Sequence, residues 1–332
     1  MRISHSARRA IGVLAAGFAL TGCGGFATNA PAGGAPSAAM AVPAIGARPD
    51  RQGSWMAPDA KATDLLYIAD LNAGDVYVYS YPGAKLEGTL TGFSAPRSEC
   101  ADASGNVFIS NGGVGEVLEY AHGGTTPIKT FTIPQAFPQG CAVNPVTGDL
   151  AVSGDALGSG PGTITIFKHA KGTPKTYSTP NVFRVYFIGY DNKGNLYVDG
   201  TDMHVAFEFA ELPANGKPAK AVTLNQSFNL PGAIAWDGEH LAVGDQVSIY
   251  GPSRIHEFSM KGSTGTRVGT TPMTDSCDVL QFALQGKRVI ATNDCAPNVK
   301  YFKYPQGGAS TKTISGGGMS QPVGVAISPK QP

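Results

Sequence analysis

The sequence predicts an all-β protein, a six-bladed β-propeller with four strands in each blade. A short unit of a Gly-containing turn and a hydrophobic strand recurs about every 41 to 48 residues, a spacing typical of propeller blades. The strand segments alternate apolar and polar residues, as half-buried strands require. The first copy, residues 65–70, lacks the hydrophobic step that precedes every other copy, and a matching step stands at 323–328. The ring is therefore expected to close with this C-terminal strand, strand A of blade one.

Strand B of each blade follows a turn built on glycine. The first copy is LLYIAD (65–70), and the turn-plus-strand copies are SGNVFISN (104–111), TGDLAVSG (147–154), KGNLYVDG (193–200), DGEHLAVGD (237–245) and QGKRVIATN (285–293). Glycine suits the tight turn between strands A and B because it adopts positive φ at no steric cost. The Asp or Asn that ends several copies is expected to cap the next turn through its own backbone.

The other three strands of each blade are assigned from hydrophobicity. Strand A is the hydrophobic step, at 100–103, 141–143, 187–190, 233–236, 279–284 and 323–328. Strand C alternates most clearly, at 76–81, 117–120, 163–167, 205–209, 254–260 and 299–304. Strand D is weaker and rich in Thr and Lys, at 129–133, 220–224 and 312–315. Lysine on an outer edge strand blocks edge-to-edge pairing, so strand D belongs at the rim.

The repeated pattern G-x-A/V-x-[DN]-x-x-G-[ND]-[LV]-[YFA]-V resembles NHL-repeat propellers over residues 65–329. It is also similar to the six-bladed folds of the gluconolactonase/senescence-marker family and of streptogramin lyase. The resemblance implies the fold. Gluconolactonase-like enzymes bind a metal with Glu, Asn and Asp at the channel, and their Glu lies in an E-G-P motif on the first A strand. Here residues 322–325 read PVGV, so that carboxylate is missing.

Residues 1–22 have the features of a lipoprotein signal peptide. Three arginines precede an apolar stretch at 10–20 that is too short to span a bilayer. The following LTGC resembles a bacterial lipobox, which implies cleavage before Cys23 and lipidation of its thiol. Gly24 after that cysteine, rather than Asp, favours the outer membrane in a diderm host. We therefore expect an exported protein, lipid-anchored to a bacterial membrane.

Composition divides the rest of the chain into a tether and a domain. Residues 23–62 are rich in Ala, Gly, Pro and Ser and form the expected flexible tether, and residues 63–332 form the propeller. An apolar cluster at 54–58 (SWMAP) is expected to pack on the first blade. Without residues 1–22 the chain carries 22 basic and 24 acidic side chains, a net charge of −2. Nucleic-acid binding needs a basic face, so we expect none.

The four remaining cysteines form an even set in an exported domain, which favours disulfides. A hairpin turning at 285–287 would pair Leu284 with Arg288 and, further out, Cys277 with Cys295. Cys100 and Cys141 both begin strand A, in neighbouring blades, but are offset by one position. Their side chains would then point to opposite faces of their strands. A disulfide between the two blades is possible and is left undecided by the sequence. The set lacks the C-x-x-C spacing of a zinc site.

Propeller ligands bind at the mouth of the central channel, where the D–A and B–C loops meet. The charged residues expected there are Arg97, Glu99, Arg184, Asp275 and Asp278 in D–A loops, and Asp155 and His204 in B–C loops. Glu99, Asp155 and Asp278 would suit a divalent cation such as calcium, because it prefers oxygen ligands. The alternative is that these are scattered, solvated loop charges.

The sequence favours a binding or scaffolding module over an enzyme. Streptogramin lyase needs a catalytic His, and His204 is the only His in a B–C loop, but no nucleophile elbow, HExxH or phosphate-loop motif is present. We expect a monomer that binds a protein, peptide or glycan of the cell envelope, and no cofactor signature is found. The alternative is a metal-dependent, lactonase-like hydrolase or a lyase at the channel mouth.

Overall fold

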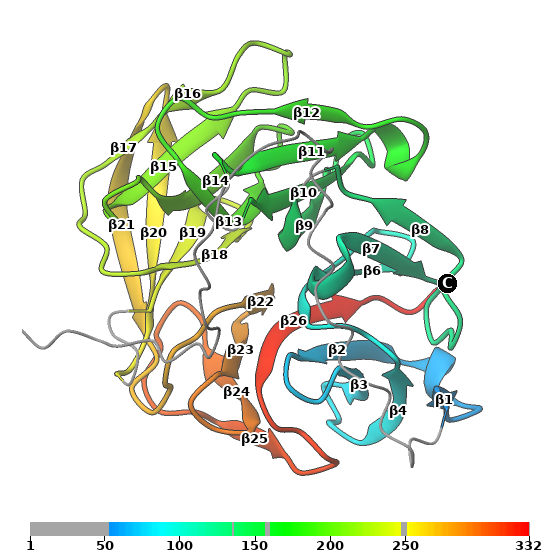
Figure 1. Cartoon of the computed structure of the whole chain (residues 1–332). Helices are drawn as coiled ribbons and strands as arrows, with labels where there is room; N and C mark the ends of the chain where they lie inside the picture. Colours follow the sequence, from blue (N-terminus) through cyan, green and yellow to red (C-terminus); the bar gives the residue numbers. More distant parts are fainter. Residues whose placement is uncertain (1–52, 135, 157–159, 247–250, 332) are drawn as a thin grey trace, which may run out of the picture. The chain divides into compact units, whose positions relative to one another are not determined.

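The computed structural model describes residues 53–134, 136–156, 160–246 and 251–331. Six sheets follow one another around a centre (Figure 1). The predicted signal peptide, Cys23 and the tether up to residue 52 lie outside the described residues. Within the described ranges, no helix has the length and apolar character that crossing a bilayer demands. Three short 3-10 turns, Ala60–Ala62, Gly112–Val114 and Lys168–Ala170, are the only helical elements there.

The predicted six-bladed, all-β architecture is confirmed. Blade one comprises β26 (Pro322–Ser328), β2 (Asp64–Asp70), β3 (Asp75–Tyr81) and β4 (Leu86–Thr91). Blade two comprises β5 (Pro96–Ala101), β6 (Val107–Asn111), β7 (Glu116–Tyr120) and β8 (Lys129–Thr132). Blade three comprises β9 (Phe137–Val143), β10 (Leu150–Asp155), β11 (Thr163–Phe167) and β12 (Lys175–Tyr177). Blade four comprises β13 (Arg184–Tyr190), β14 (Leu196–Thr201), β15 (Phe207–Leu212) and β16 (Lys220–Ala221). Blade five comprises β18 (Pro231–Trp236), β19 (Leu241–Asp245), β20 (Arg254–Lys261) and β21 (Thr264–Pro272). Blade six comprises β22 (Phe282–Gln285), β23 (Arg288–Asn293), β24 (Asn298–Lys303) and β25 (Lys312–Ser315).

Two blades carry a fifth strand at the rim. In blade one, β1 (Trp55–Met56) pairs with β4, so the apolar cluster at 54–58 does pack on the first blade. In blade five, β17 (Thr223–Leu224) leaves blade four and pairs in parallel with β21. Both additions cover an outer edge that would otherwise offer unpaired backbone groups to another chain.

The ring closes through the C-terminal strand, as the sequence predicts. Strand β26 pairs antiparallel with β2, from Leu65 opposite Ser328 to Asp70 opposite Pro322. The fully buried Asp70 carboxylate fixes this seam: Oδ1 accepts from the Ala73 amide at 2.8 Å, and Oδ2 accepts from the amides of Ser320 and Gln321 at 2.5 and 2.9 Å. One side chain therefore holds the first blade's own turn and the returning chain together.

The hydrophobic core lies between blades rather than within them. One cluster joins Leu66 and Tyr77 of blade one to Ile290 and Tyr301 of blade six. Another joins Phe108 and neighbouring residues of blade two to β10 of blade three. The alternation of side chains along each strand gives every sheet two apolar faces, and each face is covered only by the next blade. No blade can bury its surface alone.

The innermost strand of blades one to five contains an extra residue near its start. The pairing of strands A and B shifts by one residue in blades one to five, for example between Pro96 and Glu99 in β5. Strand A therefore begins three or four residues earlier than the hydrophobic step alone indicates in blades two to four. The bulge leaves ladder groups unpaired, and side chains from strand B fill the gap: Ser153 Oγ accepts from the Gly140 amide at 2.8 Å, and Asp199 Oδ1 accepts from the Phe187 amide at 3.1 Å.

Both cysteine pairs are disulfides, which indicates an oxidising compartment. The predicted bridge Cys277–Cys295 is confirmed, but the register assumed beside the hairpin turn is wrong. Leu284 pairs with Val289, not Arg288. An irregularity further along strand A of blade six offsets this one-residue difference in register. There the Asp294 amide donates to the Asp278 carbonyl at 3.4 Å, and Cys277 and Cys295 again lie opposite each other. Asp278 adopts φ 52° at this point.

The disulfide Cys100–Cys141 joins blades two and three. Cys100 lies opposite Phe108, and Cys141 lies opposite Val152, one position further along its strand B. Because side chains alternate between the faces of a strand, this offset turns the two thiols toward each other across the gap between blades. From the sequence, this one-position offset left the Cys100–Cys141 bridge undecided. In the structure, the same offset is what allows the bridge to form.

The seam can be tested by replacing the carboxylate that fixes it. We expect Asp70→Asn to lower the free energy of unfolding by about 3 kcal/mol, since its amide group would face backbone N–H donors in place of a carboxylate oxygen. Urea unfolding followed by circular dichroism measures the change. Asp59→Asn, at an exposed position, is the control and should move the midpoint little. Equal effects of the two substitutions would contradict the assigned role of Asp70.

The two disulfides should differ in their contribution to stability. Replacing both cysteines by serine is expected to cost about 3 kcal/mol for Cys277–Cys295 and about 4 kcal/mol for Cys100–Cys141, because the latter closes a longer loop, 41 against 18 residues. Guanidinium unfolding of each double variant, compared with the oxidised parent, gives both values. A larger cost for the shorter loop would show that the loop-entropy account fails here.

Candidate functional site

A cavity of about 270 Å³ lies at the end of the ring where the innermost strands begin. Every blade contributes to it, and the lining comprises Val323, Arg97, Gln139, Tyr186, Phe187, Leu230, Pro231, Gln246 and Leu280. We call it the mouth cavity. Aliphatic and aromatic groups form most of its wall, and Arg97, Gln139 and Gln246 add polar groups. Such a mixture of an apolar wall with a few placed polar groups is typical of ligand sites.

Arg97 is the charged group of the mouth cavity. It lies in the bulge of β5, where the extra residue changes which way a side chain points. Burial lowers the pKa of its guanidinium, while the charge of the buried Asp155 and the nearby Tyr186 oppose this shift. Arg97 therefore remains a cation, with planar donors suited to a carboxylate or a carbonyl group.

A second cavity of about 220 Å³ lies deeper in the channel, and Phe187 lines both cavities. Gln281 crosses this space from blade six. Its Oε1 accepts from the amides of Val325 and Glu99 at 3.1 and 3.2 Å, and its Nε2 donates to the Glu99 carbonyl at 2.7 Å. A single carboxamide thus satisfies the inner edges of blades one and two, and it narrows the channel below the mouth.

Two carboxyl groups are buried beside this channel. Burial raises the pKa of Glu99 to about 8, against the opposing effect of the Ala69 amide. Burial also raises the pKa of Asp199 well above its usual range, although the amides of Phe187 and Gly232 favour the charged form. Neither Glu99 carboxyl oxygen nor Asp199 Oδ2 has a hydrogen bond of normal geometry to a described residue. Glu99 is therefore mainly protonated near pH 7 and adds no formal charge to the channel.

The predicted mouth residues fall at different places. Arg97 lines the cavity, Asp155 lies beside it, and Glu99 lies below it. Arg184 is exposed opposite Thr201 and does not line the cavity, His204 lies on an exposed turn 3.5 Å from Asp202, and Asp275 bonds Ser310 and Lys300.

Asp278 has Asp294 as its charged neighbour. Burial raises the pKa of Asp278 to about 6, and the negative charge of Asp294 adds to the shift. Glu99, Asp155 and Asp278, the three carboxylates expected to share a cation, do not belong to any described group of three close ligands.

Most lining residues escaped the sequence reasoning because they are neutral and lie where strand A was not expected. Gln139 and Tyr186 belong to the first half of their strands, which the sequence leaves as loop. A search for charged loop residues passes over them. Their distances from the glycine of the following turn vary from six to nine residues, so the repeat offered no constant signal for them.

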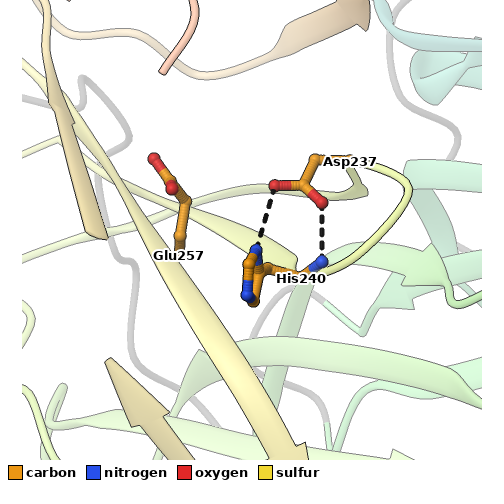
Figure 2. Close-up of side chains that lie close together, drawn as sticks. All are labelled: Asp237, His240 and Glu257. Atoms are coloured by element: carbon orange, nitrogen blue, oxygen red, sulfur yellow. Dashed lines mark hydrogen bonds and ion pairs between the residues drawn. The ribbon is translucent and has the colours of Figure 1, made fainter. Parts of the chain in front are cut away.

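A second group of titratable side chains lies at the other end of the strands, in blade five. Asp237 and His240 form the turn between β18 and β19, and Glu257 comes from β20 (Figure 2). One ligand atom from each lies within 4.8 Å of the others, and this is the only such trio of His, Cys, Asp or Glu among the described residues. Its chemistry differs from that of the mouth cavity, since it brings together two carboxylates and an imidazole.

Comparisons with known proteins identify the fold. No protein-family model matches the chain, and no curated protein matches it in sequence. A chain from the crystal structure of a nidogen/laminin complex superposes with a TM-score of 0.66 at 13% identity, covering 81% of this chain and 100% of that one. A Bacteroides caccae protein of unknown function gives a TM-score of 0.60 at 13% identity, with coverage of 80% and 98%. At this identity the likeness shows the fold alone.

The buried carboxyl groups predict an unusual dependence of stability on pH. Because the pKa of Glu99 is higher in the folded state than in the unfolded chain, folding binds a proton, and stability should fall as pH rises from about 4.5 to about 8. Glu99→Gln should weaken this slope, and Glu99→Gln with Asp199→Asn should weaken it further. Unfolding midpoints between pH 4.5 and 8.5 measure it, with Glu239→Gln as the exposed control. An unchanged slope in the double variant would refute the assignment.

Proposed function

We propose that this protein is an exported, lipid-anchored binding module of the cell envelope that receives a group of a protein, peptide or glycan partner in the mouth cavity. The observation that carries the proposal is the composition of that cavity. All six blades converge on one apolar recess with a partly buried guanidinium and two carboxamides. Rigid scaffolds commonly place binding groups at such a point.

The size of the mouth cavity favours a macromolecular partner. A volume of about 270 Å³ lies just below the range typical of pockets for whole small ligands, roughly 300–1,000 Å³. It suits one side chain, a chain terminus or one sugar ring, with the rest of the partner resting on the loops around the mouth. Arg97 would pair with a carboxylate or carbonyl of that group, and the apolar wall would cover its carbon skeleton.

The fold comparison supports a binding role by analogy. One of the two similar structures described above is a nidogen/laminin complex. A propeller of this shape thus occurs in a protein that assembles with another protein. The two disulfides agree with the predicted export, and the lipobox at Cys23 supplies the proposed anchor.

A metal-dependent hydrolase or lyase at the mouth has less support. The described residues place no three carboxylates or imidazoles together at that end of the ring. Calcium still provides a direct test, because a calcium site there would raise the melting temperature of the domain by mass action. Stabilisation by calcium that disappears in Glu99→Gln or Asp278→Asn would favour the enzyme hypothesis.

Paired arginine variants test the mouth cavity as the binding site. Peptide and glycan arrays with the purified protein would supply a ligand, and titration calorimetry would then measure its affinity. Arg97→Gln is expected to weaken binding about tenfold or more, because it leaves the ligand's polar group without a charged partner. Arg184→Gln removes an exposed arginine outside the cavity and should change the affinity less than about twofold. Equal losses in both variants, or none in Arg97→Gln, would place binding elsewhere.

A further inference from the structure

Blade five departs from its sister blades at two positions that meet in space. In blades two and four, the turn between strands A and B carries an Asp whose Oδ2 accepts from an Asn side chain: Asn106 to Asp102 at 2.9 Å, and Asn195 to Asp191 at 2.8 Å. In blade five the turn is one residue shorter, since the Asp237 amide bonds the His240 carbonyl, and His240 stands in place of the Asn.

The second departure removes a lysine. A buried glutamate on strand C faces a lysine on strand D in blade two, Glu119 opposite Lys129, and in blade four, Glu211 opposite Lys220. In blade five the equivalent glutamate, Glu257, faces Gly269. A Cβ at this position would overlap the Glu257 carboxylate, so glycine leaves the room that the carboxylate occupies.

The outcome is a pair of carboxylates, Glu257 buried and Asp237 partly buried, without a lysine or arginine. Glu257 is 7% exposed and the Asp237 side chain 9%. Among the described residues, no ion pair joins either of them to a lysine or an arginine. Two carboxylates in one buried place cost free energy unless a cation compensates them. In the sister blades that cation is supplied by the chain, and in blade five only the imidazole of His240 stands nearby.

The distances in this trio fit coordination better than hydrogen bonding. His240 Nδ1 lies 3.7 Å from Asp237 Oδ2, too far for a hydrogen bond. Two ligands of a tetrahedral zinc ion, each about 2.1 Å from the metal, stand roughly 3.4 Å apart. Neither ring nitrogen of His240 makes a hydrogen bond to a described residue, and the side chain is 25% exposed, which lets an ion enter. Figure 2 shows the three groups around one space.

Neighbouring groups hold the carboxylates as outer partners of a metal site do. Tyr304 donates to Asp237 Oδ2 at 2.7 Å, and Thr271 donates to Glu257 Oε1 at 2.9 Å. Among the described residues, Glu257 accepts a side-chain hydrogen bond only at Oε1, and Glu239 Oε1 lies 3.9 Å from His240 Nε2. Hydroxyl and carboxylate groups in such positions orient the side chains that bind the metal and raise the affinity for the metal ion.

We propose that Asp237, His240 and Glu257 form a binding site for a first-row divalent metal ion, represented by zinc, at the end of the ring opposite the mouth cavity. One nitrogen and two carboxylate oxygens suit zinc, and three protein ligands leave a further position for water or an external ligand. The ion would replace the lysine that the sister blades use. This site is independent of the proposed ligand site.

The repeat itself provides the variants that test the site. His240→Asn restores the residue of blades two and four. Gly269→Lys restores their lysine, and its Cβ obliges the Glu257 carboxylate to turn aside, which the flexible end of that side chain allows. Full-length protein carrying Cys23→Ser, stripped with a chelator, would be titrated with zinc by calorimetry. We expect one zinc ion per chain, binding more than about tenfold weaker in His240→Asn and absent in Gly269→Lys. His204→Asn, at the exposed histidine, should match the parent.

The results separate the proposal from its alternatives. No saturable zinc binding by the parent overturns it, and so does binding that persists unchanged in both repeat-restoring variants. Circular dichroism and the urea midpoint of each variant show whether a loss of binding reflects unfolding. If one variant is unfolded, the other decides. Zinc should also raise the melting temperature of the parent and of His204→Asn, and leave that of Gly269→Lys unchanged.

Discussion

Pairing between the first and last strands of the domain is the constraint on which the rest of the structure depends. Each hydrophobic face is covered only by a neighbouring blade, so a ring with a gap would expose two faces at once. Strand β26 closes this gap by pairing with β2. The buried Asp70 carboxylate holds the seam by accepting three hydrogen bonds from backbone amides. The disulfide between blades two and three adds a covalent link of the same kind elsewhere in the ring.

The bulge near the start of strand A in blades one to five shapes the channel. It turns the first residues of the strand, Arg97 and Tyr186 among them, toward the axis, where they line the mouth cavity. It also leaves backbone groups to be satisfied by strand B side chains. Ser153 does this with a hydroxyl and Asp199 with a carboxyl group, whose burial raises its pKa. The local geometry that builds the binding recess thus also places ionisable groups in a dry environment.

The repeat made the fold predictable from the sequence. The regular spacing of the copies, the division of the first copy between the two ends of the domain and the apolar/polar alternation of the strands together predict a closed six-bladed propeller. The Cys277–Cys295 bridge followed from the same alignment, although the assumed register was one residue out beside the turn. The mouth residues could not be predicted in this way, since a bulge has no hydrophobic signature. The Asp237, His240 and Glu257 trio was also missed. In the sequence His240 was interpreted as the first residue of a strand, and its proximity to Glu257 depends on the pairing of three strands.

The position of β26 also governs how the domain folds. Residues 65 and 328 pair although they are separated by nearly the whole domain, and such distant contacts make folding slow because a long loop must be ordered first. Five blades can form and stack while the first lacks its inner strand. The chain therefore keeps an open apolar edge until β26 pairs with β2, and exposed edges of this kind favour aggregation during that interval.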